Sequence, residues 1–225
     1  MNWASALNWS GNVAPIAGDA LVFAGASNTP PLNNFPANTL FGGLAFGTTA
    51  AAFNLVGNAI NLGGDIVDDS LNAQTIAINL SLTAVQSVHV SSIDGSLTIS
   101  GVIFGAPVGL NKTGSGLLTL NGANTFSGPV TVSGGTLAIA ADSTAAPNPL
   151  GFGAAGPGTL TLDGGALRST ASTQLSMNRS VLLGHAGGGG GTLVLGGVST
   201  TLGNANATGL GDECRQSDAE HDEQE

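Results

Sequence analysis

The chain has 225 residues, of which 42% are hydrophobic and only 4% aromatic, and it contains 36 glycines and no tyrosine. Its formal net charge is −10, and it has four lysine and arginine side chains in all. This composition supports a narrow aliphatic core and excludes the basic patches with which proteins bind nucleic acid or anionic membranes.

The single cysteine and the lack of targeting signals bear on the cellular compartment of the protein. The one cysteine, Cys214, lies in an acidic stretch near the C-terminus, so we expect neither disulfides nor thiolate metal sites in the folded part. No signal peptide and no apolar run of about 18 residues is present. We therefore expect a fragment of an exported protein whose signal and anchor lie elsewhere, with a cytosolic protein as the alternative.

The first 23 residues differ from the rest because they hold both tryptophans, Trp3 and Trp9. A run of turn-forming residues follows, and then a predicted strand over residues 20–23. The open end of a stack of strands exposes apolar side chains and strand edges. We expect residues 1–23 to form an N-terminal cap, with a carbohydrate-stacking platform as the alternative role of the two indole rings.

Short strands are predicted through the next part of the chain. Residues 24–39 are rich in Asn, Pro, Thr and Ala and predict a loop. Apolar residues two positions apart then recur at 44–46, 53–55 and 60–62, and the alternation is most regular from Ile76 to Leu82. No stretch has a persuasive helical period, so the chain is predicted to be all-β.

A glycine followed by a short apolar strand recurs in the second half of the chain. The glycines stand at steps of 21, 19, 23 and 33 residues, at Gly95, Gly116, Gly135, Gly158 and Gly191. A repeat of about twenty residues is typical of a solenoid, and glycine permits a sharp corner through a positive φ. We predict a right-handed parallel β-helix over residues 24–211, with about ten coils of about twenty residues.

The strands of these repeats are expected to stack with two side chains of each strand pointing inward. The first predicted inward column contains Leu97, Leu118, Leu137, Leu160 and Leu193. The second contains Ile99, Leu120, Ile139, Leu162 and Leu195, while Thr98, Thr119, Ala138, Thr161 and Val194 are expected to face outward.

Residues 110–139 carry the most specific pattern in the chain. Their regularly spaced residues include Leu110, Lys112, Gly114, Gly116, Leu118, Leu120, Gly122, Asn124, Phe126 and Gly128. This run resembles the autotransporter-associated β-strand repeat. The resemblance implies a parallel β-helical passenger region that is exported and displayed outside the cell, and it implies no enzyme activity. From the residues themselves, we expect Phe126 and Asn124 to occupy a corner, and Lys112 to lie in a solvated turn.

Residue types that could carry chemistry are few and dispersed. Asp65, Asp68 and Asp69 form the one acidic cluster of the repeat region. A calcium turn or the carboxylates of a polysaccharide-degrading enzyme would need such a group, but a solvated corner is the favoured interpretation. Asp163 and Arg168 predict at most a surface ion pair.

The remaining candidates predict no site. His89, His185 and His221 are too dispersed for zinc, and the glycine run 187–191 lacks the Lys-Ser/Thr of a phosphate loop and predicts a flexible corner. We therefore expect no catalytic residue, no cofactor-binding residue, no metal and no cofactor.

Residues 212–225 are polar and without periodicity, with seven acidic residues and one basic residue, and predict a disordered tail. The leading hypothesis is a structural stalk or passenger segment of a secreted or surface-displayed bacterial protein, with adhesion among its candidate roles. The alternative is a β-helical polysaccharide-degrading or glycan-binding domain. Expected partners are a glycan or a cell-surface molecule and, through the open C-terminal coil, a second copy stacked end to end; nucleic acid and direct membrane insertion are not expected.

Overall fold

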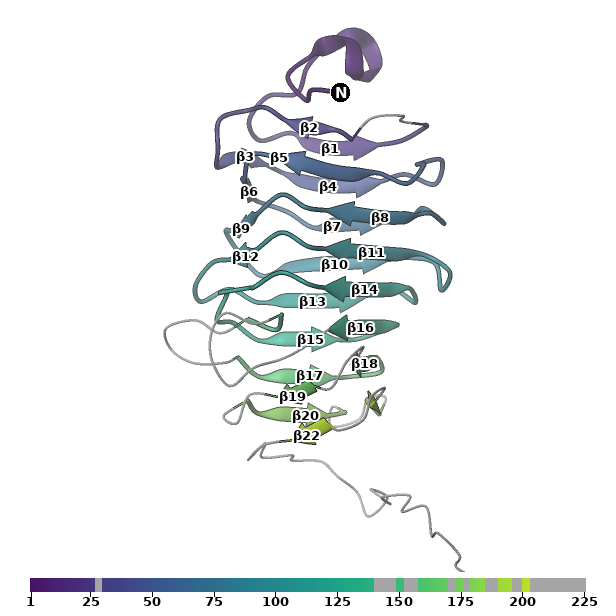
Figure 1. Ribbon diagram of the computed structural model, residues 1–225, viewed down its shortest axis with the longest axis vertical. Helices are drawn as coiled ribbons and strands as arrows, with labels where there is room; N and C mark the ends of the chain where they lie inside the picture. The colour runs from purple at the N-terminus through teal and green to yellow at the C-terminus, as the bar shows by residue number, and fades with distance from the viewer. Residues whose placement is uncertain are drawn as a thin grey trace, which may run out of the picture.

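The computed structural model describes residues 1–26, 30–139, 149–151, 158–169, 173–175, 179–184, 190–195 and 200–202. These residues form an elongated stack of short strands, in which successive coils follow one another along the long axis (Figure 1). The pairings between neighbouring coils are parallel, as between β1 and β4. The predicted all-β parallel β-helix is therefore confirmed, while the predicted tail 212–225 lies outside the described residues.

Three sheets run along the stack. The first contains β1 (Ala20–Phe23), β4 (Gly43–Phe46), β7 (Ile66–Asp68), β10 (Gln86–Val90), β13 (Leu110–Thr113), β15 (Val130–Val132), β17 (Leu160–Leu162) and β20 (Val181–Leu183). The second contains β2 (Leu32–Asn33), β5 (Asn54–Gly57), β8 (Ala73–Ile76), β11 (Ser96–Ile99), β14 (Leu117–Leu120), β16 (Thr136–Ile139), β18 (Ala166–Ser169) and β21 (Thr192–Leu195).

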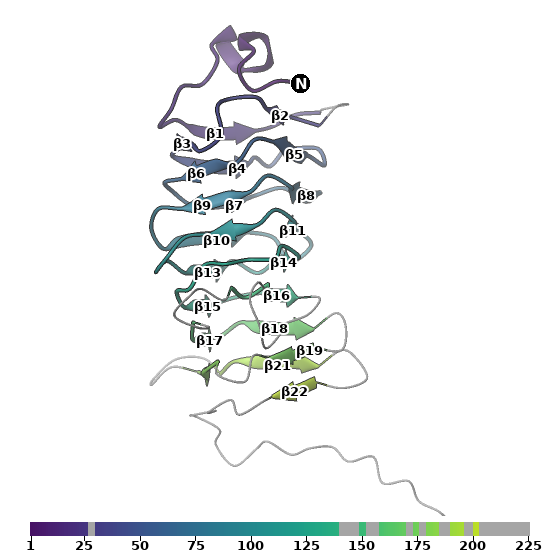
Figure 2. The ribbon, with the colours of Figure 1, turned by 60° about the vertical axis from the view of Figure 1, so that its left-hand side comes forward.

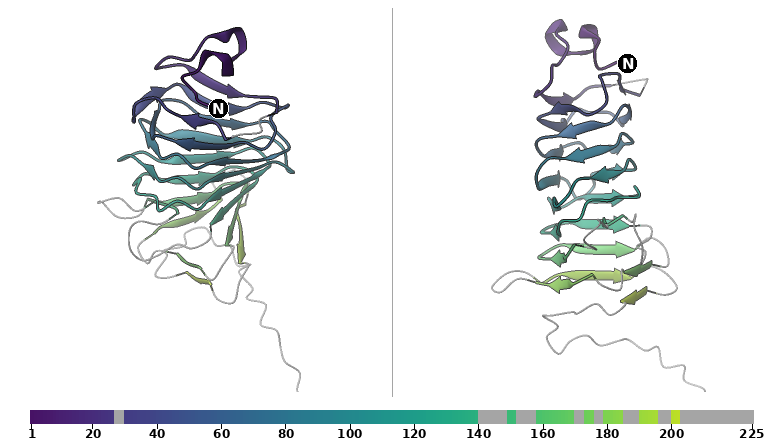
Figure 3. Two further views of the ribbon diagram at one scale, coloured as in Figure 1. Left: turned by 45° about the horizontal axis from the view of Figure 1, so that its top comes forward. Right: turned by 90° about the vertical axis from the view of Figure 1, so that its left-hand side faces the viewer.

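The third sheet is shorter and contains β3 (Thr39–Phe41), β6 (Ile60–Leu62), β9 (Leu80–Leu82) and β12 (Ile103–Phe104). Near the C-terminal end, β19 (Thr173–Leu175) pairs with β22 (Thr200–Leu202). Figure 2 and the right-hand view of Figure 3 show the strands stacked edge to edge at regular intervals. Among the described residues, no helix has the length and apolar character needed to cross a membrane.

The number of coils is smaller than the sequence predicts. Each of the two long sheets contains eight strands in the described part of the chain, so about ten coils was too high. Two features explain the difference. The 3-10 turns η1 (Ala6–Asn8) and η2 (Ser10–Asn12) lie beyond β1 instead of forming a coil (Figure 1), and the coil that joins Val132 to its partner Leu162 is unusually long.

The inward columns are correct for three repeats and wrong for the fourth. Leu97 pairs with Leu118 and Leu118 with Leu137, as predicted. The next member is Leu167 of β18, whereas Leu160 belongs to β17 in the first sheet. Both sheets use the same apolar–small–apolar pattern, so spacing alone does not distinguish them. The outward column is corrected likewise, with Arg168 in place of Thr161. Ala138 keeps its register in that column, but it is buried and not exposed as expected.

The long alternation from Ile76 to Leu82 is not one strand. It is divided between β8 and β9, which belong to different sheets, yet Ile76, Ile78, Leu80 and Leu82 are all buried. The alternation of side chains therefore continues around the bend between the sheets. Residues 24–39, expected to be a loop, contain the two-residue strand β2 and the first residue of β3.

The repeat glycines are needed mainly for space. Of the five, only Gly135 has a positive φ, of 61°, so the predicted explanation by backbone conformation fails for the other four. At Gly116, a Cβ would overlap the carbonyl oxygen of Ser92 in the preceding coil. Because stacked coils approach this closely, a side chain at such a corner would push them apart.

Candidate functional site

The coil that begins at β13 shows how the repeat pattern is used. From Leu110 to Val132, every even-numbered residue is buried except Gly114, which is intermediate. No odd-numbered residue in the same span is buried. The residues that define the repeat are the even-numbered ones, so the pattern specifies the interior of the solenoid and leaves its outer surface free to vary.

Lys112 is part of this interior. The expectation from the sequence that it lies in a solvated turn is therefore wrong. Its side chain is 1% exposed and occupies the inward column between Val88 and Val132. Its Nζ donates hydrogen bonds to the carbonyl oxygens of Thr113 at 2.7 Å, Gly114 at 2.9 Å and Gly134 at 3.2 Å. The ammonium group thereby joins the corners of two successive coils.

Burial changes the proton affinity of this lysine. Removal of the ammonium from water lowers the pKa of Lys112 from 10.5 to about 8. The three carbonyl oxygens favour the charged form but do not replace full hydration. Lys112 is therefore a buried donor that holds backbone groups, with no carboxylate partner among the described residues.

The corner between β14 and β15 is built as predicted. Phe126 and Asn124 are both fully buried. The Asn124 Oδ1 accepts a hydrogen bond of 2.7 Å from the backbone N–H of Ile103 in the preceding coil, and its Nδ2 donates one of 2.7 Å to the carbonyl oxygen of Pro149 in the next. One amide thus links three coils, while the phenyl ring fills the space under the corner.

The acidic cluster does not form a convergent site. Asp65 accepts a hydrogen bond of 2.7 Å from the backbone N–H of Ser87, and Asp69 accepts one from the Ser91 hydroxyl. Asp68, in contrast, lies in the inward column between Phe46 and Val90 and is fully buried. The favoured interpretation of a solvated corner is therefore wrong for Asp68.

Asp68 belongs to a buried polar network. Its Oδ1 accepts hydrogen bonds from the Ser70 backbone N–H at 3.0 Å and the Ser70 hydroxyl at 2.6 Å. The Gln74 amide donates to the Ser70 Oγ at 2.9 Å and accepts from the Phe53 backbone N–H at 2.8 Å. Oδ2 of Asp68 has no partner in the described part of the chain, and burial raises the pKa of this carboxyl above its usual value.

The remaining sequence candidates do not come together. His89 faces outward on β10 and its Nδ1 lies 2.9 Å from the Thr113 hydroxyl. His185 and His221 lie outside the described residues, as does part of the glycine run 187–191. In the described part of the chain, no group of three or more His, Cys, Asp or Glu side chains is placed to hold a metal ion.

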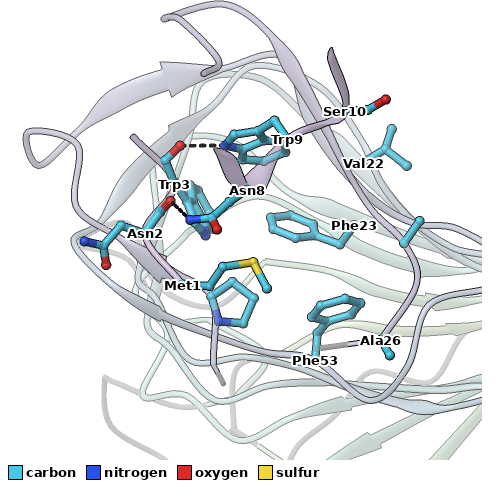
Figure 4. Close-up of a pocket in the computed structure, with 12 residues that line it drawn as sticks. Met1, Asn2, Trp3, Asn8, Trp9, Ser10, Val22, Phe23, Ala26 and Phe53 are labelled. Carbon is cyan, nitrogen blue, oxygen red and sulfur yellow. Dashed lines mark hydrogen bonds between the residues drawn. The ribbon is translucent and has the colours of Figure 1, made fainter. Parts of the chain in front are cut away.

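The aromatic residues gather at the N-terminal end. Trp3 is 1% exposed and packs against Phe23 and Phe41, at ring-centroid distances of 5.4 and 5.7 Å. Trp9 is half-buried and donates an Nε1 hydrogen bond of 2.6 Å to the Trp3 carbonyl oxygen. Beside these rings lies an open cavity of about 260 Å³, which Phe23, Phe53 and Met1 also line (Figure 4).

Two comparisons with known proteins bear on this architecture. Residues 110–139 match the family described as passenger-associated-transport-repeat. The chain is also 36% identical, over 177 residues, to the adhesin BmaC autotransporter of Brucella suis biovar 1 (strain 1330). That alignment covers 77% of this chain but 4% of the relative, so the chain spans a small part of the relative's length. No solved structure matches the chain.

The chain carries an autotransporter passenger repeat. The passenger repeat extends from the first residue of β13 to the last residue of β16.

Sequence reasoning placed the apolar members of the passenger repeat correctly but missed the buried polar ones. Lys112 follows Leu110 by two positions, which is the spacing of inward residues, and this signal could have located it. Arg179 was also missed. It is fully buried, and its guanidinium donates hydrogen bonds to the carbonyl oxygens of Gly158 at 2.8 Å and Gly151 at 2.7 Å. Arg179 precedes the buried Val181 by two positions, so the same spacing could have located it.

Proposed function

We propose that the chain is a shaft segment of an exported passenger, displayed extracellularly or at the outer-membrane surface, where it serves as a stalk in adhesion. The observation that carries the proposal is the alternation of buried and non-buried residues from Leu110 to Val132, within the matched segment. The buried side chains fix the interior of the coil, while the outward positions are free to vary, as a spacer allows. The adhesin named above supports the adhesive setting.

We further propose that the shaft has no catalytic activity of its own. A glycoside hydrolase needs two carboxyl groups that face one sugar ring. Asp68 points into the solenoid core, whereas Asp65 and Asp69 bind backbone and hydroxyl groups of the next coil. No arrangement in the described part of the chain favours the enzyme alternative over the stalk.

Surface display of a shortened chain tests the stalk proposal. The chain is fused to an autotransporter export signal and membrane anchor, and residues 110–129 are deleted in one version. Because Leu110 pairs with Val130 and Gln86 with Leu110, the deletion removes one coil and brings Val130 over Gln86. We expect both versions to reach the cell surface and to be removed by protease added to intact cells.

The control is a shorter, out-of-register deletion, over residues 110–124, which removes an odd number of residues. It therefore breaks the inward alternation and should abolish display of folded protein. The proposal fails if the in-register deletion is lost from the surface as completely as the out-of-register one. Release of reducing sugar from a polysaccharide panel by the intact shaft would refute the absence of catalysis.

A further inference from the structure

The N-terminal strand of the first sheet has an unpaired edge. β1 pairs with β4 and with no other described strand. The carbonyl oxygen of Asp19 accepts a hydrogen bond from Gly42, and that of Phe23 accepts one from Gly47. Backbone groups of successive residues point to opposite edges of a strand, so the N–H and C=O groups of Ala20 and Val22 point away from β4. They are available to another strand.

Open space lies beside this edge. One cavity of about 260 Å³ is lined by Val22 and Phe23, and a second of about 380 Å³ is lined by Ala20 and Leu21. Both are also lined by Trp9, Ser10 and Val22. The two cavities therefore adjoin at these three residues, between β1 and the segment that carries η1 and η2, and together they are called the slot.

The slot has a defined chemistry. At one end, the rings of Trp9, Phe23 and Phe53 line the cavity, and no side chain that lines it is charged (Figure 4). At the other end, Asp19 is the only charged residue of the lining, and its Oδ2 already accepts a hydrogen bond of 2.9 Å from the Ile16 backbone N–H. The walls therefore suit large apolar side chains, and the Asp19 carboxylate supplies one negative charge at the end of the slot.

We propose that β1 is a strand-accepting site for an extended segment of a partner protein. The segment adds one strand to the first sheet by hydrogen-bonding to Val22 and Ala20, and a large apolar side chain enters the cavity over Phe23. The partner segment has apolar residues at alternating positions and a basic residue at one end, where it meets the Asp19 carboxylate. A single segment fits because η1 and η2 overhang the slot (Figure 1), whereas the last coil of a second copy is several strands wide.

The first experiment uses the intact chain and a synthetic peptide. Leucine and threonine alternate in a fluorescein-labelled peptide with lysines at both ends, and binding is followed by fluorescence polarisation and by the emission of Trp3 and Trp9, the two tryptophans of the chain. Two versions carry N-methyl groups on the leucines only or on the threonines only. Since alternate N–H groups point to opposite edges of a strand, we expect one version to bind like the parent and the other to lose at least about tenfold in affinity.

The second experiment changes the edge itself. Val22→Pro removes the free N–H while the ladder to β4 stays intact, because proline is tolerated on an edge strand. Val22→Ala is the matched control, which shortens the exposed side chain and keeps the N–H. We expect the proline variant to lose at least about tenfold in affinity and the alanine variant to stay within about threefold; circular dichroism confirms that both are folded.

Several results would overturn the proposal. These are no binding of the parent peptide, equal loss or no loss for both N-methylated versions, and equal affinity of the two Val22 variants. Sedimentation velocity supplies the last control. Self-association of the chain that the peptide dissolves would show that a second copy occupies the slot, which contradicts a partner segment.

Discussion

Replacement of Lys112 by methionine tests the buried ammonium directly. Lys112→Met keeps the length of the side chain and removes the three hydrogen bonds to Thr113, Gly114 and Gly134. A hydrogen bond from a charged donor contributes about 1.5–3 kcal/mol and an unpaired buried acceptor costs about 1–3 kcal/mol. The apolar side chain recovers the desolvation cost that depresses the lysine pKa, so we expect a net loss of about 2–3 kcal/mol at pH 7.

The sign of the pH dependence follows from the lowered pKa of Lys112, about 8 instead of 10.5. Between these values the unfolded chain binds the lysine proton more fully than the folded chain does, so this group adds stability as the pH rises. The methionine variant lacks this contribution. The difference in unfolding free energy between wild type and Lys112→Met should therefore be larger at pH 10 than at pH 7.

Urea denaturation followed by circular dichroism measures both effects. Arg168→Met is the matched control, because it removes one positive charge from an exposed outward position on β18 and should change stability by no more than about 0.5 kcal/mol. A Lys112→Met variant as stable as wild type at both pH values would show that the carbonyl contacts contribute nothing. Equal losses from both substitutions would show that net charge alone is responsible.

Three further predictions concern other positions of the solenoid. Phe126→Ala should cost about 3–5 kcal/mol because the ring is fully buried, whereas Thr119→Ser on the outer face should stay within about 0.5 kcal/mol; equal losses in urea denaturation would contradict the assignment of faces. Asp68→Asn should raise the melting temperature at pH 7 and not at pH 3, since a raised carboxyl pKa means that wild type loses stability as the pH rises through it; equal melting shifts at both pH values would refute this. Gly128→Ala should destabilise by about 1–3 kcal/mol because a Cβ there overlaps Val108, and Gly190→Ala, which meets nothing within 4 Å, is the control that should not.

Much of the fold follows from the sequence because its inward residues alternate along the chain. The glycine spacing and the alternation located β11, β14 and β16 and their shared columns. The same alternation misplaced Leu160, because adjacent sheets of one coil use identical patterns and only the length of the connection between them distinguishes the two. A pattern of period two therefore identifies the face of a residue without identifying its sheet.

The buried polar groups were harder to predict. The polarity of their side chains predicted that Lys112 and Asp68 are exposed to solvent, since charged residues are almost never fully buried unless they are paired. Both instead follow the positional alternation and are compensated by backbone carbonyls or by Ser70. These partners come from neighbouring turns and coils and are not visible in local composition. The strand-accepting edge of β1 was likewise not predictable, because it depends on which residues of the N-terminal segment lie above that strand.

The central claim is that the passenger repeat encodes the inside of a shaft. It is tested most directly by the reactivity of single cysteines along residues 110–132 towards a water-soluble maleimide, in a background where Cys214 is replaced by serine. Positions 117, 121 and 131 are compared with 118, 120 and 130, which are buried. We predict rapid modification of the first three in the folded protein, and modification of the other three only after denaturant is added. Similar rates for the two groups in the folded protein would contradict the claim.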